Sequence, residues 1–79
     1  MKGESAERDI AEKAKRYLKG ELKRAGMTYG ELAHRLSEMG LPETEVSVKS
    51  KLSRGTFSAV FFLATMKVIG RQTVSLDDL

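Results

Sequence analysis

The sequence predicts an all-α domain built as a bundle of four helices. Apolar residues recur at the three- and four-residue spacing of a helix through most of the chain. A glycine follows each of the four periodic stretches, which is a typical helix end. Hydrophobic residues make up 41% of the 79 residues, enough for one small core. Residues 1–79 are therefore expected to form a single domain, with a helical core over about residues 5–70 and a tail over residues 71–79.

The first predicted helix begins at Ser5, a suitable N-cap, and runs through Ala25. Gly20 interrupts it at a cost of about 1 kcal/mol relative to alanine. The apolar stripe keeps its phase across this glycine, so the helix is expected to continue to Gly26. The stripe consists of Ile10, Ala14, Tyr17, Leu18, Leu22 and Ala25.

The second predicted helix covers Tyr29–Met39 and ends before Gly40. Thr28 and Glu31 have the spacing of a capping box, which satisfies free N–H groups at a helix start. His34 lies opposite the apolar face and is expected to be exposed to solvent, without a metal or catalytic role. That apolar face consists of Leu32, Ala33, Leu36 and Met39.

The third predicted helix runs from about Glu45 to Arg54 and ends at Gly55. Val48 and Leu52 are expected to point inward. Val46, Ser50 and Ser53 then point outward, flanked by Ser47, Lys49 and Arg54. Two short helices joined by a turn over residues 28–55 predict a helix-turn-helix motif.

The fourth predicted helix lies between Ser58 and Gly70 and is apolar on almost every side. This composition is typical of a helix buried centrally in a domain. Its expected core residues are Phe61, Phe62, Leu63, Met66 and Ile69. In the short tail, Val74 and Leu76 alternate with polar residues, and three alternatives stay open: packing as an extended strand, addition to a partner, or fraying.

Charge is distributed unevenly along the chain, whose net charge is +3. Residues 46–71 hold five basic side chains and no acidic one, whereas residues 26–45 hold one basic and four acidic side chains. The basic window covers most of the third helix and is typical of a surface that binds phosphate. A solvated basic surface without a partner explains the same pattern equally well.

Several classes of function are disfavoured by composition. The chain has no cysteine, which excludes disulfides and thiolate metal sites and suggests a cytoplasmic location. We expect no signal peptide and no membrane span, because the longest apolar run, residues 59–64, is far too short. We also expect no enzyme activity, metal, cofactor or small-molecule substrate, because the sequence has no glycine-rich phosphate loop and no carboxylate pair typical of a catalytic pocket.

Three stretches resemble the phage-repressor and Cro type of helix-turn-helix: T-Y-G-E-L-A (28–33), K-L-S-R-G (51–55) and the apolar helix that ends V-I-G (68–70). More closely, residues 21–36 and 53–63 resemble an uncharacterised family of short bacterial domains of unknown function. The repressor resemblance implies a four-helix repressor-like bundle, regulation of transcription, and a symmetric homodimer on DNA. The second helix is about one turn longer than in repressors, and its connection to the third helix is also longer.

A DNA-binding domain of this kind would place the third helix in the major groove. Ser47 and Ser50 would contact bases, and Val46 would contact a thymine methyl group. The start of the second helix, at Thr28 and Tyr29, offers free N–H groups to a phosphate, although it is equally explained as a simple helix cap. The candidate DNA-binding residues are Thr28, Tyr29, Val46, Ser47, Lys49, Ser50, Lys51, Ser53 and Arg54.

The alternative function is a small helical module that binds another protein and no nucleic acid. The same bundle would serve, with the tail or the basic face as the docking surface. The two hypotheses differ in one measurable property, which is binding to duplex DNA of mixed sequence at low salt.

Overall fold

The computed structural model of the chain describes residues 2–79. No strand occurs among these residues, and the all-α prediction is confirmed. The four helices are followed by one short 3-10 turn. In chain order the elements are α1 (Lys2–Ala25), α2 (Tyr29–Glu38), α3 (Glu45–Arg54), α4 (Ala59–Ile69) and η1 (Leu76–Asp78).

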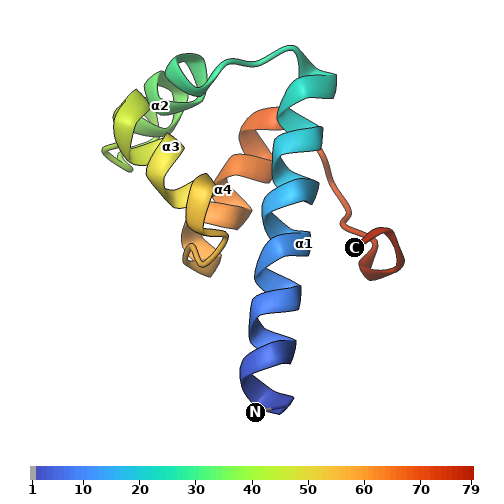
Figure 1. Ribbon diagram of the computed structural model, residues 1–79. Coiled ribbons are helices and arrows are strands. Elements are labelled where there is room, and N and C mark those ends of the chain that lie inside the picture. Colours follow the sequence, from blue (N-terminus) through green and yellow to red (C-terminus); the bar gives the residue numbers. More distant parts are fainter. Residues whose placement is uncertain (1) are drawn as a thin grey trace.

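In the view of Figure 1, α4 appears between α1 and the α2–α3 pair. α1 packs against α3 and α4, and α2 packs against the same two helices. A bend of 114° separates α3 from α4. No single described helix is long and apolar enough to cross a membrane, although α3 and α4 together meet that criterion by length and composition.

The helix starts are set by local hydrogen bonds. The predicted capping box at α2 is present, since the Glu31 N–H donates to Thr28 Oγ1 at 3.1 Å and the Thr28 N–H donates to the Glu31 carboxylate at 3.4 Å. Ser58 caps α4 by accepting a hydrogen bond from the Phe61 N–H at 3.0 Å, as its position predicts. These bonds satisfy N–H groups that a helix start would otherwise leave without partners.

The predicted start of the first helix is wrong. α1 begins at Lys2, so Ser5 lies inside the helix and does not precede it. Lys2 and Glu4 upstream of Ser5 are good helix formers, and the helix extends through Gly3 between them. Met1 lies outside the described residues.

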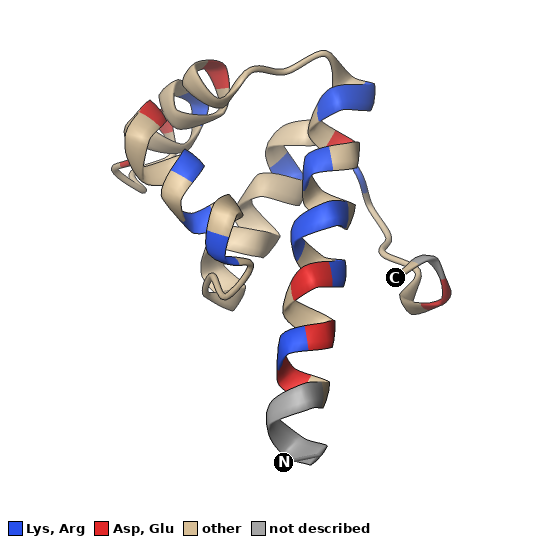
Figure 2. Ribbon diagram, viewed as in Figure 1, with Lys and Arg blue, Asp and Glu red and all other residues tan. Residues whose placement is uncertain are grey.

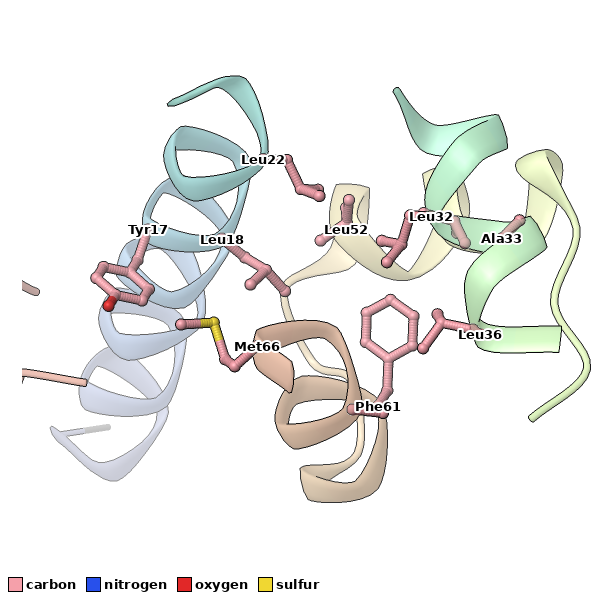
Figure 3. Packing of buried hydrophobic residues seen from close by; sticks show 11 residues of the cluster. Tyr17, Leu18, Leu22, Leu32, Ala33, Leu36, Leu52, Phe61 and Met66 are labelled. Atoms are coloured by element: carbon pink, nitrogen blue, oxygen red, sulfur yellow. The ribbon is translucent and has the colours of Figure 1, made fainter. Parts of the chain in front are cut away.

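The core collects side chains from all four helices (Figure 3). Leu18 and Leu22 of α1 point toward Leu52 of α3, while Phe61 of α4 lies close to Leu36 of α2. Burying these side chains is the main favourable contribution to folding. The buried hydrophobic residues are Tyr17, Leu18, Leu22, Leu32, Ala33, Leu36, Val48, Leu52, Phe61, Ala64 and Met66.

The predicted burial of α4 is wrong on one side of the helix. Leu63, expected in the core, is 60% exposed, and Val60 is 61% exposed. Because successive residues turn by about 100°, Leu63 projects about 200° away from the buried Phe61. Ala64 and Thr65 take the buried positions instead, while Phe62 and Ile69 are half-buried. α4 therefore has an inner face and a narrow outer face, which carries Val60 and Leu63 together with the exposed Lys67.

Two further expected core residues lie at the surface. Ile10 is 61% exposed, although the next residue, Ala11, approaches Gly55 closely, so Ile10 lies on the side of α1 that is turned away from this contact. Met39 is 47% exposed, because α2 ends at Glu38 and Met39 follows as the C-cap. Both residues fit the helical spacing, but packing against a neighbour decides burial.

Two polar groups are buried among the described residues without a hydrogen-bond partner. They are the hydroxyl of Tyr17 and the hydroxyl of Thr65. A buried polar group without a partner lowers stability by about 1–3 kcal/mol. Thr65 is fully buried in α4, so its hydroxyl lowers the stability of the core.

Candidate nucleic-acid interface

The outer face of α3 is the surface that the sequence singles out for DNA. Thr44 caps the helix, and Val48 and Leu52 are fully buried. The side chains on the opposite face are therefore turned to solvent, and Val46 is 77% exposed. This face, here called the outer face of α3, consists of Val46, Lys49, Ser50, Ser53 and Arg54.

The two cationic side chains of this face, Lys49 and Arg54, form no ion pair with another described residue. Across residues 2–79, neither the Lys49 side chain nor the Arg54 side chain takes part in a hydrogen bond or an ion pair. Their charges are therefore not neutralised by the protein. Charges of this kind attract phosphate groups from solution.

Ser47, a predicted base contact, is used inside the protein. Its hydroxyl accepts a hydrogen bond from the Thr44 N–H at 2.8 Å and lies 2.6 Å from the Glu43 carboxylate. Its own N–H donates to Thr44 Oγ1 at 3.1 Å, which completes a second capping box. The side chain is half-buried at the start of α3 and does not belong to the outer face.

Lys51, a candidate DNA-binding residue, also has partners within the protein. Its ammonium group pairs with the Glu43 carboxylate, whose side chain is only 8% exposed. The same ammonium lies 5.1 Å from the ring centroid of Phe61, within the range of a cation–π interaction. Sequence reasoning missed this role of Glu43, because only the folded connection between α2 and α3 brings the carboxylate over α3. The Ser37 hydroxyl fixes that connection by donating to the Glu43 carbonyl oxygen at 3.1 Å and accepting from the Glu43 N–H at 3.2 Å.

The start of α2 is flanked by carboxylates as well as by N–H groups. Glu31 approaches the Thr28 N–H within the capping box. The carboxylate of Glu45 lies close to Gly30, since a Cβ built on Gly30 would be 3.4 Å from Glu45 Oε1. Thr28 is exposed and Tyr29 is half-buried. The helix dipole at this end favours an anion, but the two neighbouring carboxylates oppose the approach of a phosphate.

Lys15 of α1 lies next to the C-terminal end of α3, which the sequence did not indicate. A Cβ built on Gly55 would be 2.4 Å from the Ala11 carbonyl oxygen and 3.3 Å from Lys15 Cβ. Gly55 also has a φ of 73°, so both its conformation and its contact with α1 favour glycine. The close approach places Lys15, which pairs with Glu12 at 3.0 Å, beside the end of α3.

Basic residues of α1 continue this surface toward α2. Lys19 and Lys23 line an open pocket of about 420 Å³ together with Thr28 and Tyr29. Figure 2 shows lysine and arginine segments on α3 and along the C-terminal half of α1. The basic surface therefore extends over two helices, whereas the sequence pattern pointed to α3 and the residues that follow it.

The histidine of the chain is exposed, as predicted. His34 lies on the solvent side of α2, 3.4 Å from the carboxylate of Glu38. No group of three or more metal-ligating side chains occurs in the part of the chain that the structure describes.

Comparison with known protein families finds a match over most of the chain. A family model described as "Domain of unknown function (DUF6471)" matches residues 10–74, which include α2, α3 and α4 in full. No curated protein and no solved structure matches the chain. The matched description names no activity, so function has to be inferred from the surface chemistry of the chain.

Proposed function

We propose that this chain, which belongs to the family of domains of unknown function named above, is a helix-turn-helix domain. It binds double-stranded DNA through the outer face of α3. The observation that carries the proposal is the pair of exposed cations, Lys49 and Arg54, which no described group of the protein neutralises. Phosphates neutralised by such side chains release counterions, and this release drives most non-specific DNA binding.

The arrangement of α2 and α3 supports the proposed motif. The two helices pack on each other, and each begins with a capping box. In a helix-turn-helix the first helix crosses the DNA backbone, while the second lies in the major groove. α3 is held by two buried side chains, so its outer face is available for contact along the length of the helix.

Within this proposal, base contacts come from a small set of side chains. Val46 offers an apolar contact to a thymine methyl group, and the hydroxyls of Ser50 and Ser53 offer hydrogen bonds to base edges. Serine discriminates poorly among bases, so sequence preference is expected to be modest. Ser47 and Lys51 contribute indirectly, by fixing the start and the flank of α3. Lys15 and Lys19 of α1 extend the phosphate contacts beyond α3.

The proposal carries two further expectations from the repressor resemblance. Regulation of transcription in a bacterial cytoplasm is the proposed setting. A symmetric homodimer is the proposed binding species, because two linked half-sites multiply affinity.

A second candidate function is a protein-interaction module. The outer face of α4 favours it, because Val60 and Leu63 lie one helical turn apart and are 61% and 60% exposed. Exposed apolar side chains in adjacent positions are typical of protein contact surfaces. A second copy of the chain on this face would be compatible with DNA binding by α3.

The test is a binding titration with a fluorescently labelled duplex of mixed sequence. We expect the wild-type affinity to fall steeply between about 50 and 200 mM salt. The double variant Lys49→Gln with Arg54→Gln should lower the slope of log affinity against log salt by about 1.8, because each phosphate contact contributes about 0.9. Both side chains are exposed, so the fold should be retained.

The matched control is Lys13→Gln with Arg16→Gln, which removes the same charge from the face of α1 that is turned toward the tail. This pair should leave the salt slope close to the wild-type value. Equal losses in the two double variants would mean that only net charge matters. Absence of binding at about 50 mM salt would favour the interaction module.

A further inference from the structure

A polar pocket of about 770 Å³ lies between α1 and the tail, away from the outer face of α3. It is lined along one face of α1 by residues at three- and four-residue spacing, and the tail runs beside this face (Figure 1). Its charged lining consists of Lys13, Arg16, Glu21, Arg24 and Arg71. Pockets of this size are large enough to enclose a small ligand.

The pocket is organised by one buried carboxylate. The side chain of Glu21 is only 4% exposed, and its two oxygens lie 2.6 Å from Arg24 Nη2 and 3.5 Å from Arg71 Nε. A single carboxylate thus orients two guanidinium groups, one from α1 and one from the tail. A planar guanidinium that is already oriented loses less conformational freedom on binding an anion.

The lining has more positive than negative charge. Four of the five charged side chains that line the pocket are basic and one, Glu21, is acidic. Arg24 has a further interaction besides its pair with Glu21, so the positive charge of the lining rests on Lys13, Arg16 and Arg71. Lys13 also pairs with Asp9 at 3.6 Å, but that contact is exposed and therefore weak. Cations gathered in a concave site attract anions more strongly than the same charges spread over a convex surface.

Gly20 lies in the wall of the same pocket, in the middle of α1. Glycine destabilises a helix interior relative to alanine. Packing within the protein does not require it, because a Cβ built there would have its nearest neighbour, Arg24 Nη2, at 3.9 Å. The absence of a side chain keeps the wall open between the surrounding cations and lets a ligand approach the helix backbone.

We infer that this pocket binds a small soluble ligand that carries phosphoryl groups. Guanidinium groups match the geometry of phosphate oxygens and form charge-assisted, paired hydrogen bonds with them. Arg24 and Arg71 hold one side of the anion, and Arg16 and Lys13 approach from about two and three turns further toward the N-terminus of α1. This site is independent of DNA binding by α3, and neither proposal rests on the other.

The test uses the full chain and sodium pyrophosphate as the probe, in a calorimetric titration at constant ionic strength. We expect saturable binding at one site per chain. Lys13→Gln with Arg16→Gln should raise the Kd at least about tenfold, because two charge-assisted contacts are lost. Lys49→Gln with Arg54→Gln, which removes the same charge from α3, should leave the Kd unchanged. The Kd values of ADP and citrate are measured in the same way. ADP tests a phosphoryl ligand that carries an organic group, and citrate tests a ligand that carries only carboxylates.

Gly20 supplies a variant that keeps every charge. Gly20→Ala should raise the midpoint of thermal unfolding of the unliganded protein and weaken pyrophosphate binding, and Gly20→Leu should weaken binding further. Absence of saturable binding to pyrophosphate, or tighter binding to citrate than to pyrophosphate, would overturn the inference. So would a Kd that is unchanged in both the Lys13/Arg16 pair and Gly20→Leu.

Discussion

α3 and α4 are nearly equal in length and both end at a left-handed glycine, yet they differ in how much of their surface the protein uses. α3 is held by Val48 and Leu52 and leaves a whole face exposed. α4 buries most of its circumference and leaves only a narrow outer face. The difference separates stability from binding: substitutions inside α4 should change the free energy of unfolding, and substitutions on the outer face of α3 should change affinity.

The largest expected effect is on the inner face of α4. Phe61→Ala should lower the free energy of unfolding by about 3–5 kcal/mol, through lost burial and the cavity that remains. The ring is 4% exposed, and it lies 5.5 Å from the ring of Phe57. Urea unfolding followed by circular dichroism measures the change. A loss below about 1 kcal/mol would mean that α4 does not organise the core.

A smaller effect is expected from the helix starts, where α3 and α4 differ again. Thr44→Ala should cost about 0.5–2 kcal/mol. Thr44 Oγ1 accepts one hydrogen bond from the Ser47 N–H, and Ser58 Oγ accepts one from the Phe61 N–H, so each substitution removes one bond. Thr44→Ala keeps the reciprocal bond from the backbone N–H of residue 44 to Ser47 Oγ. Ser58→Ala is therefore expected to cost at least as much as Thr44→Ala. A clearly larger loss for Thr44→Ala in parallel unfolding curves would contradict this comparison.

Removing a buried hydroxyl from α4 should stabilise the protein. Thr65→Val replaces a fully buried hydroxyl that has no described partner with a methyl group of similar size. The free energy of unfolding should rise by about 1 kcal/mol, because an unsatisfied polar group is no longer buried. The midpoint of thermal unfolding reports this rise. A decrease would show that the hydroxyl has a hydrogen-bond partner in solution.

The smallest effect is expected on the outer face of α4. Leu63→Ala should change the free energy of unfolding by less than about 0.5 kcal/mol, as is usual for exposed positions. Leu63 is 60% exposed, although its sequence context alone predicts a core residue. A loss of several kcal/mol in unfolding experiments would show that this face is buried in solution, for example against a second copy of the chain.

The boundaries of the helices were largely predictable, because they depend on contacts within a few residues. Thr28, Ser58 and the glycines that end α3 and α4 mark those boundaries in the sequence and in the structure. The second capping box was missed because its third helical residue is Ser47, where a glutamate or glutamine is the usual signal.

The local sequence pattern does not predict which side of α4 is buried, nor which cations of the candidate site pair with a carboxylate. A uniformly apolar segment does not indicate which arc faces the core, so Leu63 was placed inside. Lys51 and Arg54 look alike in the sequence, but Glu43 neutralises only Lys51. Lys15 joins the end of α3 through the contact at Gly55, forty residues away along the chain. Each of these outcomes depends on packing between elements distant in sequence.

The most direct test of DNA binding by α3 is a nuclear magnetic resonance titration of the full chain with duplex DNA at low salt. The backbone amides of the outer face of α3 (Val46, Lys49, Ser50, Ser53 and Arg54) should show the largest chemical-shift changes, with smaller changes at Lys15 and Lys19. The amides around Val60 and Leu63 should change little. Changes confined to α4 or to the tail, with α3 unaffected, would contradict the account.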